Sequence, residues 1–255
     1  MPEPLVFENA AVRAFRERAG ECGSDLALAT LLDDAAREIG FEHFALIHAL
    51  SLQRAAPQLI RLDNYPDAWT ERIVGRRLFV DDPILHASLR TNCGFAWDEL
   101  AEHLVLQKRH RVIMAGAARA GLRQGFTVPA NVAFEPSGSC SFATRGTGAI
   151  AAWRIESAEL IGGHALKAAR RLHGWPRMPP VDLHLSPRET EVLHWAARGK
   201  SNTDIAAIVG IGVETVKTYI AATLRKIGVG DRTQAAIQAV RWGLIVPAES
   251  IPPPE

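Results

Sequence analysis

The sequence predicts an α+β protein, in which an N-terminal α/β/α sandwich around an antiparallel sheet precedes a smaller all-α C-terminal domain. Three observations carry this prediction. Helical segments and short apolar strands share the chain up to residue 172, without the regular alternation of a parallel sheet. A proline-rich stretch follows, and only helical segments come after it. The length of 255 residues suits two domains of ordinary size.

The elements of the N-terminal domain follow from hydrophobic periodicity. Helical spacing of apolar residues predicts helices over residues 8–19, 26–39, 66–77, 100–120 and 156–172. Apolar or alternating runs predict strands over residues 41–50, 58–62, 125–133 and 139–145. Because the helices come in pairs around the strands, we expect a single antiparallel sheet with helices on both faces.

The domain boundary is predicted from composition. The stretch Gly174-Trp-Pro-Arg-Met-Pro-Pro contains three prolines, which favour an extended and semi-stiff chain. We therefore place the N-terminal domain at residues 1–174, the linker at 175–184 and the C-terminal domain at 185–245.

The helices of the C-terminal domain are predicted from their start and stop signals. Ser186-Pro187-Arg188-Glu189 combines an N-cap hydroxyl, a proline at the first helical position and a Glu at N3. This helix ends at Gly199; further helices are expected over 202–209, over 213–227 and from Asp231 to Trp242. The turn Gly210-Ile211-Gly212 is typical of a helix-turn-helix, whose second helix enters the major groove of DNA.

The outward face of helix 213–227 carries the candidate DNA contacts Thr215, Lys217, Thr218 and Ala221. Small hydroxyl side chains can approach base edges or phosphates, and a lysine can reach guanine or the backbone. Residues 181–245 hold eight basic and six acidic side chains, a net +2 in a chain of net +1, so a DNA surface would be a local patch. By spacing alone, a plain helical bundle with a solvated polar face remains the alternative.

A second informative group lies in the N-terminal domain. Asn64-Tyr65-Pro66-Asp-Ala-Trp69, Asp82-Pro83 and Trp97 supply two indole N–H donors, a phenol and a carboxylate. In an apolar pocket, these groups could hold a neutral ligand that carries an amide N–H and two carbonyls. The alternative is that the aromatic side chains fill the core and that Asp82 caps a turn.

The C-terminal motifs resemble a known family. Leu185-Ser-Pro-Arg-Glu-Thr-Glu-Val-Leu, Gly199-Lys-Ser-Asn-Thr-Asp-Ile-Ala and Val213-Glu-Thr-Val-Lys-Thr-Tyr-Ile are similar to the DNA-binding domain of LuxR-type transcription regulators. Glu189, Leu193 and Gly199 occupy the positions that mark this family. The resemblance implies that the four candidate contacts face DNA, and that a dimer binds two half-sites of an operator.

The N-terminal motifs, together with Gly125-Phe-Thr-Val-Pro, resemble the autoinducer-binding domain of quorum-sensing LuxR regulators, which respond to N-acyl-homoserine lactones. By this resemblance, Trp69 donates to the lactone carbonyl and Asp82 accepts from the amide N–H. Tyr65 donates to the amide carbonyl, and Trp97 packs near the lactone ring. Gly125 allows close packing of the strand.

Two further positions follow from the same resemblance. The strand over residues 139–144 lines the pocket in the family, and we take Thr144 as its candidate ligand contact. Four residues after Trp69, where the family usually has a tyrosine beside the acyl group, this chain has Ile73. This departure favours an acyl group unlike the common straight 3-oxo chains, for example a branched or aryl one.

The expected partners are therefore an acyl-homoserine lactone signal, a double-stranded DNA operator, a second copy of the chain and, as a further candidate, RNA polymerase. Helices 156–172 and 231–242 are the candidate dimer surfaces. Two alternatives are a receptor that acts without a ligand and a response regulator controlled by phosphorylation. The second is disfavoured because its acidic pair should follow a strand, whereas Asp33-Asp34 falls within a predicted helix.

Other classes of protein lack support in the sequence. It has no Gly-x-Ser-x-Gly motif, phosphate-binding glycine loop or paired His/Glu zinc motif, so we expect no enzyme, cofactor or metal site. Three widely spaced cysteines fit no disulfide framework. Neither a membrane-spanning run nor a secretory segment is visible, so a cytoplasmic location is expected.

Overall fold

The computed structural model describes residues 10–48, 60–132, 137–174 and 183–246. The chain divides into two compact units, residues 1–176 and 177–255. Residues 175–182, which make up most of the predicted linker, lie outside the described ranges, so the extended form of the linker stays a prediction.

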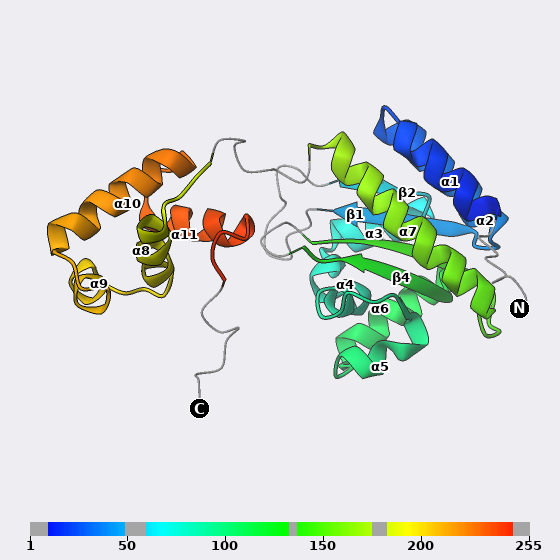
Figure 1. Ribbon diagram of the computed structural model, residues 1–255. Helices are drawn as coiled ribbons and strands as arrows, with labels where there is room; N and C mark the ends of the chain where they lie inside the picture. The colour runs from blue at the N-terminus through cyan, green and yellow to red at the C-terminus, as the bar shows by residue number, and fades with distance from the viewer. Residues whose placement is uncertain (1–9, 49–59, 133–136, 175–182, 247–255) are drawn as a thin grey trace, which may run out of the picture. The chain divides into compact units, whose positions relative to one another are not determined.

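The N-terminal unit is built on a five-stranded sheet with the order β2-β1-β5-β4-β3 (Figure 1). Every pair of neighbouring strands is antiparallel, which confirms the predicted sheet. The strands are β1 (His43–His48), β2 (Ile60–Asp63), β3 (Phe95–Ala96), β4 (Gln124–Ala130) and β5 (Gly138–Thr144). The two-residue β3 was not predicted, because so short a strand has no measurable alternation.

Helices cover both faces of this sheet, as predicted (Figure 1). On one face, α7 (Ala152–Leu172) packs against β1, β4 and β5, and α1 (Ala10–Glu21) and α2 (Asp25–Glu38) pack against α7. The acidic pair Asp33-Asp34 lies inside α2, as expected. The other face carries the shorter helices α3 (Asp67–Gly75), α4 (Pro83–Ser88), α5 (Leu100–His103) and α6 (Lys108–Arg119), with the 3-10 turns Leu78–Asp81 and Trp97–Glu99.

The single helix predicted over residues 100–120 is wrong, because two helices occupy that segment. Leu104 leaves the helical conformation with φ −156° and buries its side chain in the apolar cluster of this layer. Gln107 then begins α6 in an extended conformation, and its N–H donates to Nδ1 of His110 at 3.2 Å. Tertiary burial of Leu104 therefore overrides the helical spacing of the sequence.

Strand alternation separates the two faces of the sheet. Phe126, Cys140 and Phe142 face the α1–α2–α7 layer and join its apolar core. Their neighbours Thr127, Ser139 and Ser141 point to the opposite face, because successive side chains of a strand alternate. The α3–α6 layer therefore meets a sheet surface that carries several hydroxyl groups.

The C-terminal unit contains α8 (Pro187–Ala197), α9 (Asn202–Val209), α10 (Val213–Ile227) and α11 (Arg232–Arg241). The predicted capping box is present: Ser186 Oγ accepts from Glu189 N, and Glu189 Oε2 accepts from Ser186 N at 2.6 Å. Gly210 ends α9 in the left-handed conformation with φ +71°. Helices α9 and α10 meet at a bend of 106°, within the range of helix-turn-helix pairs.

Within the described residues, no single helix combines the length and the apolar character needed to cross a bilayer. The bent pair of α9 and α10 meets those two criteria only when its helices are taken together.

Candidate functional site

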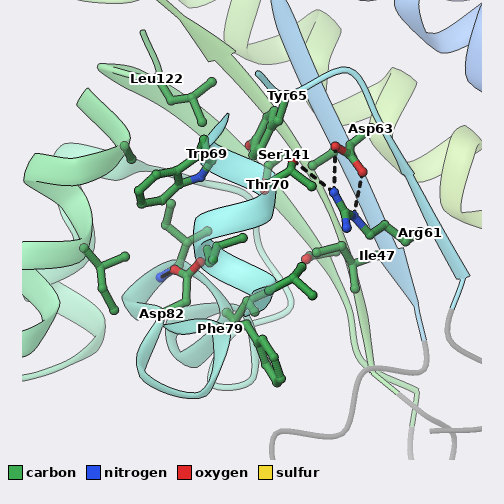
Figure 2. A pocket seen from close by; sticks show the side chains of 18 of the residues that line it. Ile47, Arg61, Asp63, Tyr65, Trp69, Thr70, Phe79, Asp82, Leu122 and Ser141 are labelled. Atoms are coloured by element: carbon green, nitrogen blue, oxygen red, sulfur yellow. Dashed lines mark hydrogen bonds and ion pairs between the residues drawn. The ribbon is translucent and has the colours of Figure 1, made fainter. Parts of the chain in front are cut away.

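A cavity of about 230 Å³ lies between the hydroxyl-bearing face of the sheet and helices α3, α4 and α6 (Figure 2). Five of the six predicted ligand contacts line it: Tyr65, Trp69, Ile73, Asp82 and Trp97. Apolar side chains form most of the remaining wall, including Ala45, Ile47, Val74, Phe79, Ile84, Leu85, Ile113, Met114, Ala117 and Leu122. The arrangement is typical of a small-molecule site, which combines apolar walls with a few polar anchors.

Asp82 is held at the cavity by its role as the N-cap of α4. Its Oδ1 accepts from the N–H of Ile84 at 2.9 Å, and Pro83 occupies the first helical position. Burial raises the pKa of Asp82 to about 6, although the N–H groups of Ile84 and Leu85 and the nearby His86 act in the opposite direction. The same carboxylate therefore caps α4 and lines the cavity. Its remaining acceptor capacity suits a ligand N–H.

Trp69 lies on α3 and is only 4% exposed. Gly116 of α6 makes this position available, because a Cβ on residue 116 would lie 2.8 Å from Cζ3 of Trp69. Among the described residues, no hydrogen-bond partner is found for the indole N–H of Trp69, which leaves this donor for a ligand.

The indole N–H of Trp97, by contrast, is already bonded within the protein. It donates to Thr127 Oγ1 at 3.0 Å, and Thr127 Oγ1 lies 2.9 Å from Ser141 Oγ. Gly125 admits the ring of Trp97, since a Cβ there would lie 2.5 Å from Cε2 of the indole. Trp97 therefore serves as a packed wall of the cavity rather than as a second free donor.

Tyr65 lines the cavity together with Ser141, so its phenol lies beside this hydrogen-bonded chain. Burial and the nearby carboxyl groups of Asp82 and Asp63 raise the pKa of Tyr65 far above its ordinary value. The phenol therefore stays neutral and keeps its proton as a donor. The sequence did not reveal the Thr127–Ser141 contact, because it depends on the β4–β5 register that places these two residues opposite each other.

Thr144 does not line the cavity. It has the same strand parity as Phe142, whose side chain packs in the α1–α2–α7 layer, and its Oγ1 accepts from Gly146 N at 3.1 Å. Ser139 and Ser141 are the hydroxyl residues of β5 that line the cavity. Asn64 also has a structural place, because its side chain accepts from Phe44 N at 2.7 Å and donates to Asp33.

Two charged residues of the cavity wall were missed by the sequence reasoning. Arg61 and Asp63 of β2 line the cavity and form an ion pair, with 2.6 Å between Arg61 Nε and Asp63 Oδ2. Their alternation with the buried Ile60 and Leu62 was the available signal, since it places both charged side chains on one face of the strand.

The second candidate site is the exposed face of α10. Thr215, Lys217, Thr218 and Ala221 are all exposed, while Val216 beneath them is fully buried. Lys217 Nζ lies 2.6 Å from Glu214 Oε1, and Thr218 Oγ1 donates to Glu214 O at 2.9 Å. The structure thus brings the four predicted residues together on one surface, where the lysine is paired to a highly exposed glutamate.

The opposite end of α10 is attached to α8 by a partly buried ion pair. Lys226 Nζ lies 2.6 Å from Glu189 Oε2, and the side chain of Glu189 is 7% exposed. Burial acts to raise the pKa of Glu189, but hydrogen bonds from Lys226 and Ser186 outweigh it and hold that pKa below its ordinary value. This carboxylate therefore fixes α10 against α8.

Comparison with known protein families matches both units. Residues 24–171 match the autoinducer binding domain, and residues 183–239 match the bacterial regulatory proteins of the luxR family. The chain belongs to the LuxR family of transcription regulators. It combines a domain that binds a small-molecule signal with a helix-turn-helix domain that binds DNA.

Individual relatives agree with this assignment. The transcriptional activator AhyR of Aeromonas hydrophila is 30% identical over 227 residues, which cover 86% of each chain. The regulatory protein SdiA of Escherichia coli is 26% identical over 213 residues, covering 82% of this chain and 86% of SdiA. A crystal structure of SdiA has the same fold, with a TM-score of 0.61 and 24% identity over 91% of this chain and 97% of that one. These relatives are transcription regulators.

Proposed function

We propose that the cavity binds an N-acyl-homoserine lactone and that this signal controls operator binding by a homodimer. The observation that carries the proposal is the convergence of the Trp69 N–H, the Asp82 carboxylate and the Tyr65 phenol on one apolar cavity. Two donors and one acceptor complement the two carbonyls and the amide N–H of an acylated lactone. We assign Trp69 to the lactone carbonyl, Asp82 to the amide N–H and Tyr65 to the amide carbonyl.

The acyl group would lie beside Ile73, which lines the cavity. An isoleucine in place of a tyrosine changes both the space and the polarity at this position, so we propose an acyl group other than a straight 3-oxo chain. A binding series in which N-(3-oxo-octanoyl)-homoserine lactone proved the tightest ligand would contradict this part of the proposal.

For the DNA-bound state, we propose that Thr215, Lys217, Thr218 and Ala221 contact the operator. Residues 1–174 and 185–245 would form the two functional domains, with 175–184 as the linker. Dimer contacts are assigned to α7 and α11, whose apolar Trp153, Leu160 and Ile237 are half exposed. The dimer would act in the cytoplasm, with RNA polymerase as a further partner.

The proposed switch is ligand-linked stability. A ligand that binds only the folded domain stabilises it by about 2.7 kcal/mol at a hundredfold excess over Kd. A receptor that is partly unfolded or monomeric without its signal would thereby form the dimer that binds DNA. Control by phosphorylation has less support, because Asp33 lies within α2 and forms an ion pair with Arg37 at 2.9 Å.

The test measures dimer fraction and operator affinity with and without lactone, for the wild type and for Asp82→Asn. For the wild type, both the dimer fraction and the operator affinity should rise when lactone is added. Asp82→Asn should lose the response while the DNA-binding unit stays folded. Equal dimer fraction and equal DNA affinity in both conditions would overturn the proposed switch, and a wild-type response in Asp82→Asn would remove Asp82 from the site.

A further inference from the structure

The cavity contains a charged pair that the three lactone anchors do not use. Arg61 and Asp63 lie two residues apart on β2, so their side chains share the cavity face of the sheet. Besides the Nε–Oδ2 contact, Arg61 Nη2 donates to Asp63 Oδ1 at 3.1 Å. The same nitrogen donates to Thr70 Oγ1 at 3.1 Å, which ties the edge strand to α3.

In the view of the cavity, Arg61 and Asp63 lie apart from Trp69 and Asp82 (Figure 2). Figure 2 shows Trp69 and Asp82 on one side of the view and Arg61, Asp63 and Ile47 on the other. All of them line the same cavity. A ligand whose amide lies near Trp69 and Asp82, and whose acyl group extends across the cavity, would place the far end of that group near Arg61.

A plain alkyl end is a poor occupant of that position. The side chains of Arg61 and Asp63 are 33% and 13% exposed, so water can reach the pair when no ligand covers it. An alkyl group would displace this water without replacing its hydrogen bonds, which carries a desolvation penalty.

The hydrogen-bonding capacity of the pair indicates what fits better. Arg61 Nη1 has donors for which the described residues supply no partner, and each oxygen of Asp63 retains acceptor capacity beyond its bond to Arg61. Adjacent donor and acceptor groups suit a hydroxyl, which both donates and accepts. A ligand carboxylate would instead face the charge of Asp63, and an ammonium would face that of Arg61.

We propose that Arg61, Asp63 and Thr70 form a specificity subsite for an acyl group that carries a hydroxyl at its far end, either an alcohol or a phenol. This inference rests on the proposed function, because it requires a lactone held by its amide. If Arg61 and Asp63 had only a structural role on the edge strand β2, the expected ligand preference would be different. An inward-pointing charge on an edge strand protects against strand addition, and it would give no preference for a hydroxyl.

The experiment titrates the full-length protein with two matched pairs of ligands. One pair is N-octanoyl- and N-(ω-hydroxyoctanoyl)-homoserine lactone. The other is N-phenylpropanoyl- and N-(para-hydroxyphenylpropanoyl)-homoserine lactone. In at least one pair, the hydroxylated ligand should bind about ten- to a hundredfold more tightly, as expected for hydrogen bonds to charged groups.

The matched variant is the double substitution Arg61→Met with Asp63→Leu, which removes both charges without leaving one unpaired. It should reduce the hydroxyl preference to about one, while the hydroxyl-free lactones still bind through the unchanged Trp69 and Asp82. A second variant, Arg61→Lys, keeps the charge but loses the planar fork, and should reduce the preference in part.

The outcomes are distinguishable. Equal binding within both pairs by the wild type overturns the subsite and leaves the proposed function standing. A hydroxyl preference that persists in the double variant also overturns it, because the hydroxyl is then recognised elsewhere. Failure of all four lactones to bind the wild type overturns the proposed function and the subsite with it.

Discussion

Gly116 offers a sharp test of how the cavity positions its indole donor. It lies in α6, and a Cβ at this position would be 2.8 Å from Cζ3 and 3.3 Å from Cη2 of Trp69. Ordinary carbon–carbon contacts are about 3.5–4.0 Å, so Gly116→Ala requires the ring to move by roughly 1 Å. Because Trp69 is otherwise enclosed and lines the cavity, the ring can move only into that space.

Two opposing terms determine the stability of this variant. Alanine in place of glycine favours a helix by up to about 1 kcal/mol. Overpacking costs about 1–3 kcal/mol in a filled core, and the cavity beside Trp69 reduces that cost. We therefore expect the ligand-free protein to change by no more than about 1 kcal/mol. Lactone affinity should fall by about two- to tenfold, because the N–H of Trp69 loses a hydrogen bond of about 0.5–1.5 kcal/mol.

The assay combines chemical denaturation of the ligand-free protein with calorimetric titration of N-octanoyl-homoserine lactone. Gly163→Ala is the matched control, because Gly163 also lies in a helix and a Cβ there meets nothing within 4 Å. The control should gain up to about 1 kcal/mol of stability and keep its lactone affinity. A folded Gly116→Ala protein with wild-type affinity would refute the assignment of Trp69 as a positioned donor.

Three further predictions concern the ionisable residues. Lactone affinity should rise by up to tenfold per pH unit as the pH approaches about 6 from below, because the amide N–H of the lactone needs an ionised Asp82. Over the same rise in pH the ligand-free protein should lose stability, because the raised pKa of Asp82 means that folding favours its protonated form. Calorimetric titration at several pH values checks the affinity, and a flat profile would contradict the prediction. Lys217→Ala should reduce the salt dependence of operator binding by about one unit, measured by fluorescence anisotropy; an unchanged slope would exclude a phosphate contact. Glu189→Gln should destabilise the C-terminal unit by about 1–3 kcal/mol in thermal unfolding, because Lys226 loses its charged partner; a change below measurement error would count against this.

Short-range signals made the C-terminal unit predictable. Ser186, Ser201 and Asp231 each accept a backbone N–H two or three residues ahead, and Gly210 has the left-handed conformation that ends α9. Such caps depend on residues within one helical turn, so they can be read along the chain. The same holds for the exposed face of α10, which helical periodicity assigns directly.

The candidate cavity was only partly predictable. The motif residues Tyr65, Trp69 and Asp82 were identified, but the sequence did not indicate that Trp97 bonds to Thr127 or that Arg61 reaches Thr70. Thr144, a ligand contact by the family resemblance, has the strand parity of Phe142 and therefore points away from the cavity. The interruption at Leu104 depends on burial against residues distant in sequence.

By itself, the sequence determined the class of the protein, the order of its elements and the residue types offered to signal and DNA, because periodicity, caps and motifs are properties of neighbouring residues. The tertiary structure alone decided which hydroxyls face the cavity, which indole keeps a free donor and which charged residues line the cavity wall. Those outcomes depend on strand register and on contacts between residues far apart in the chain, such as Thr127 with Ser141 and Gly116 with Trp69.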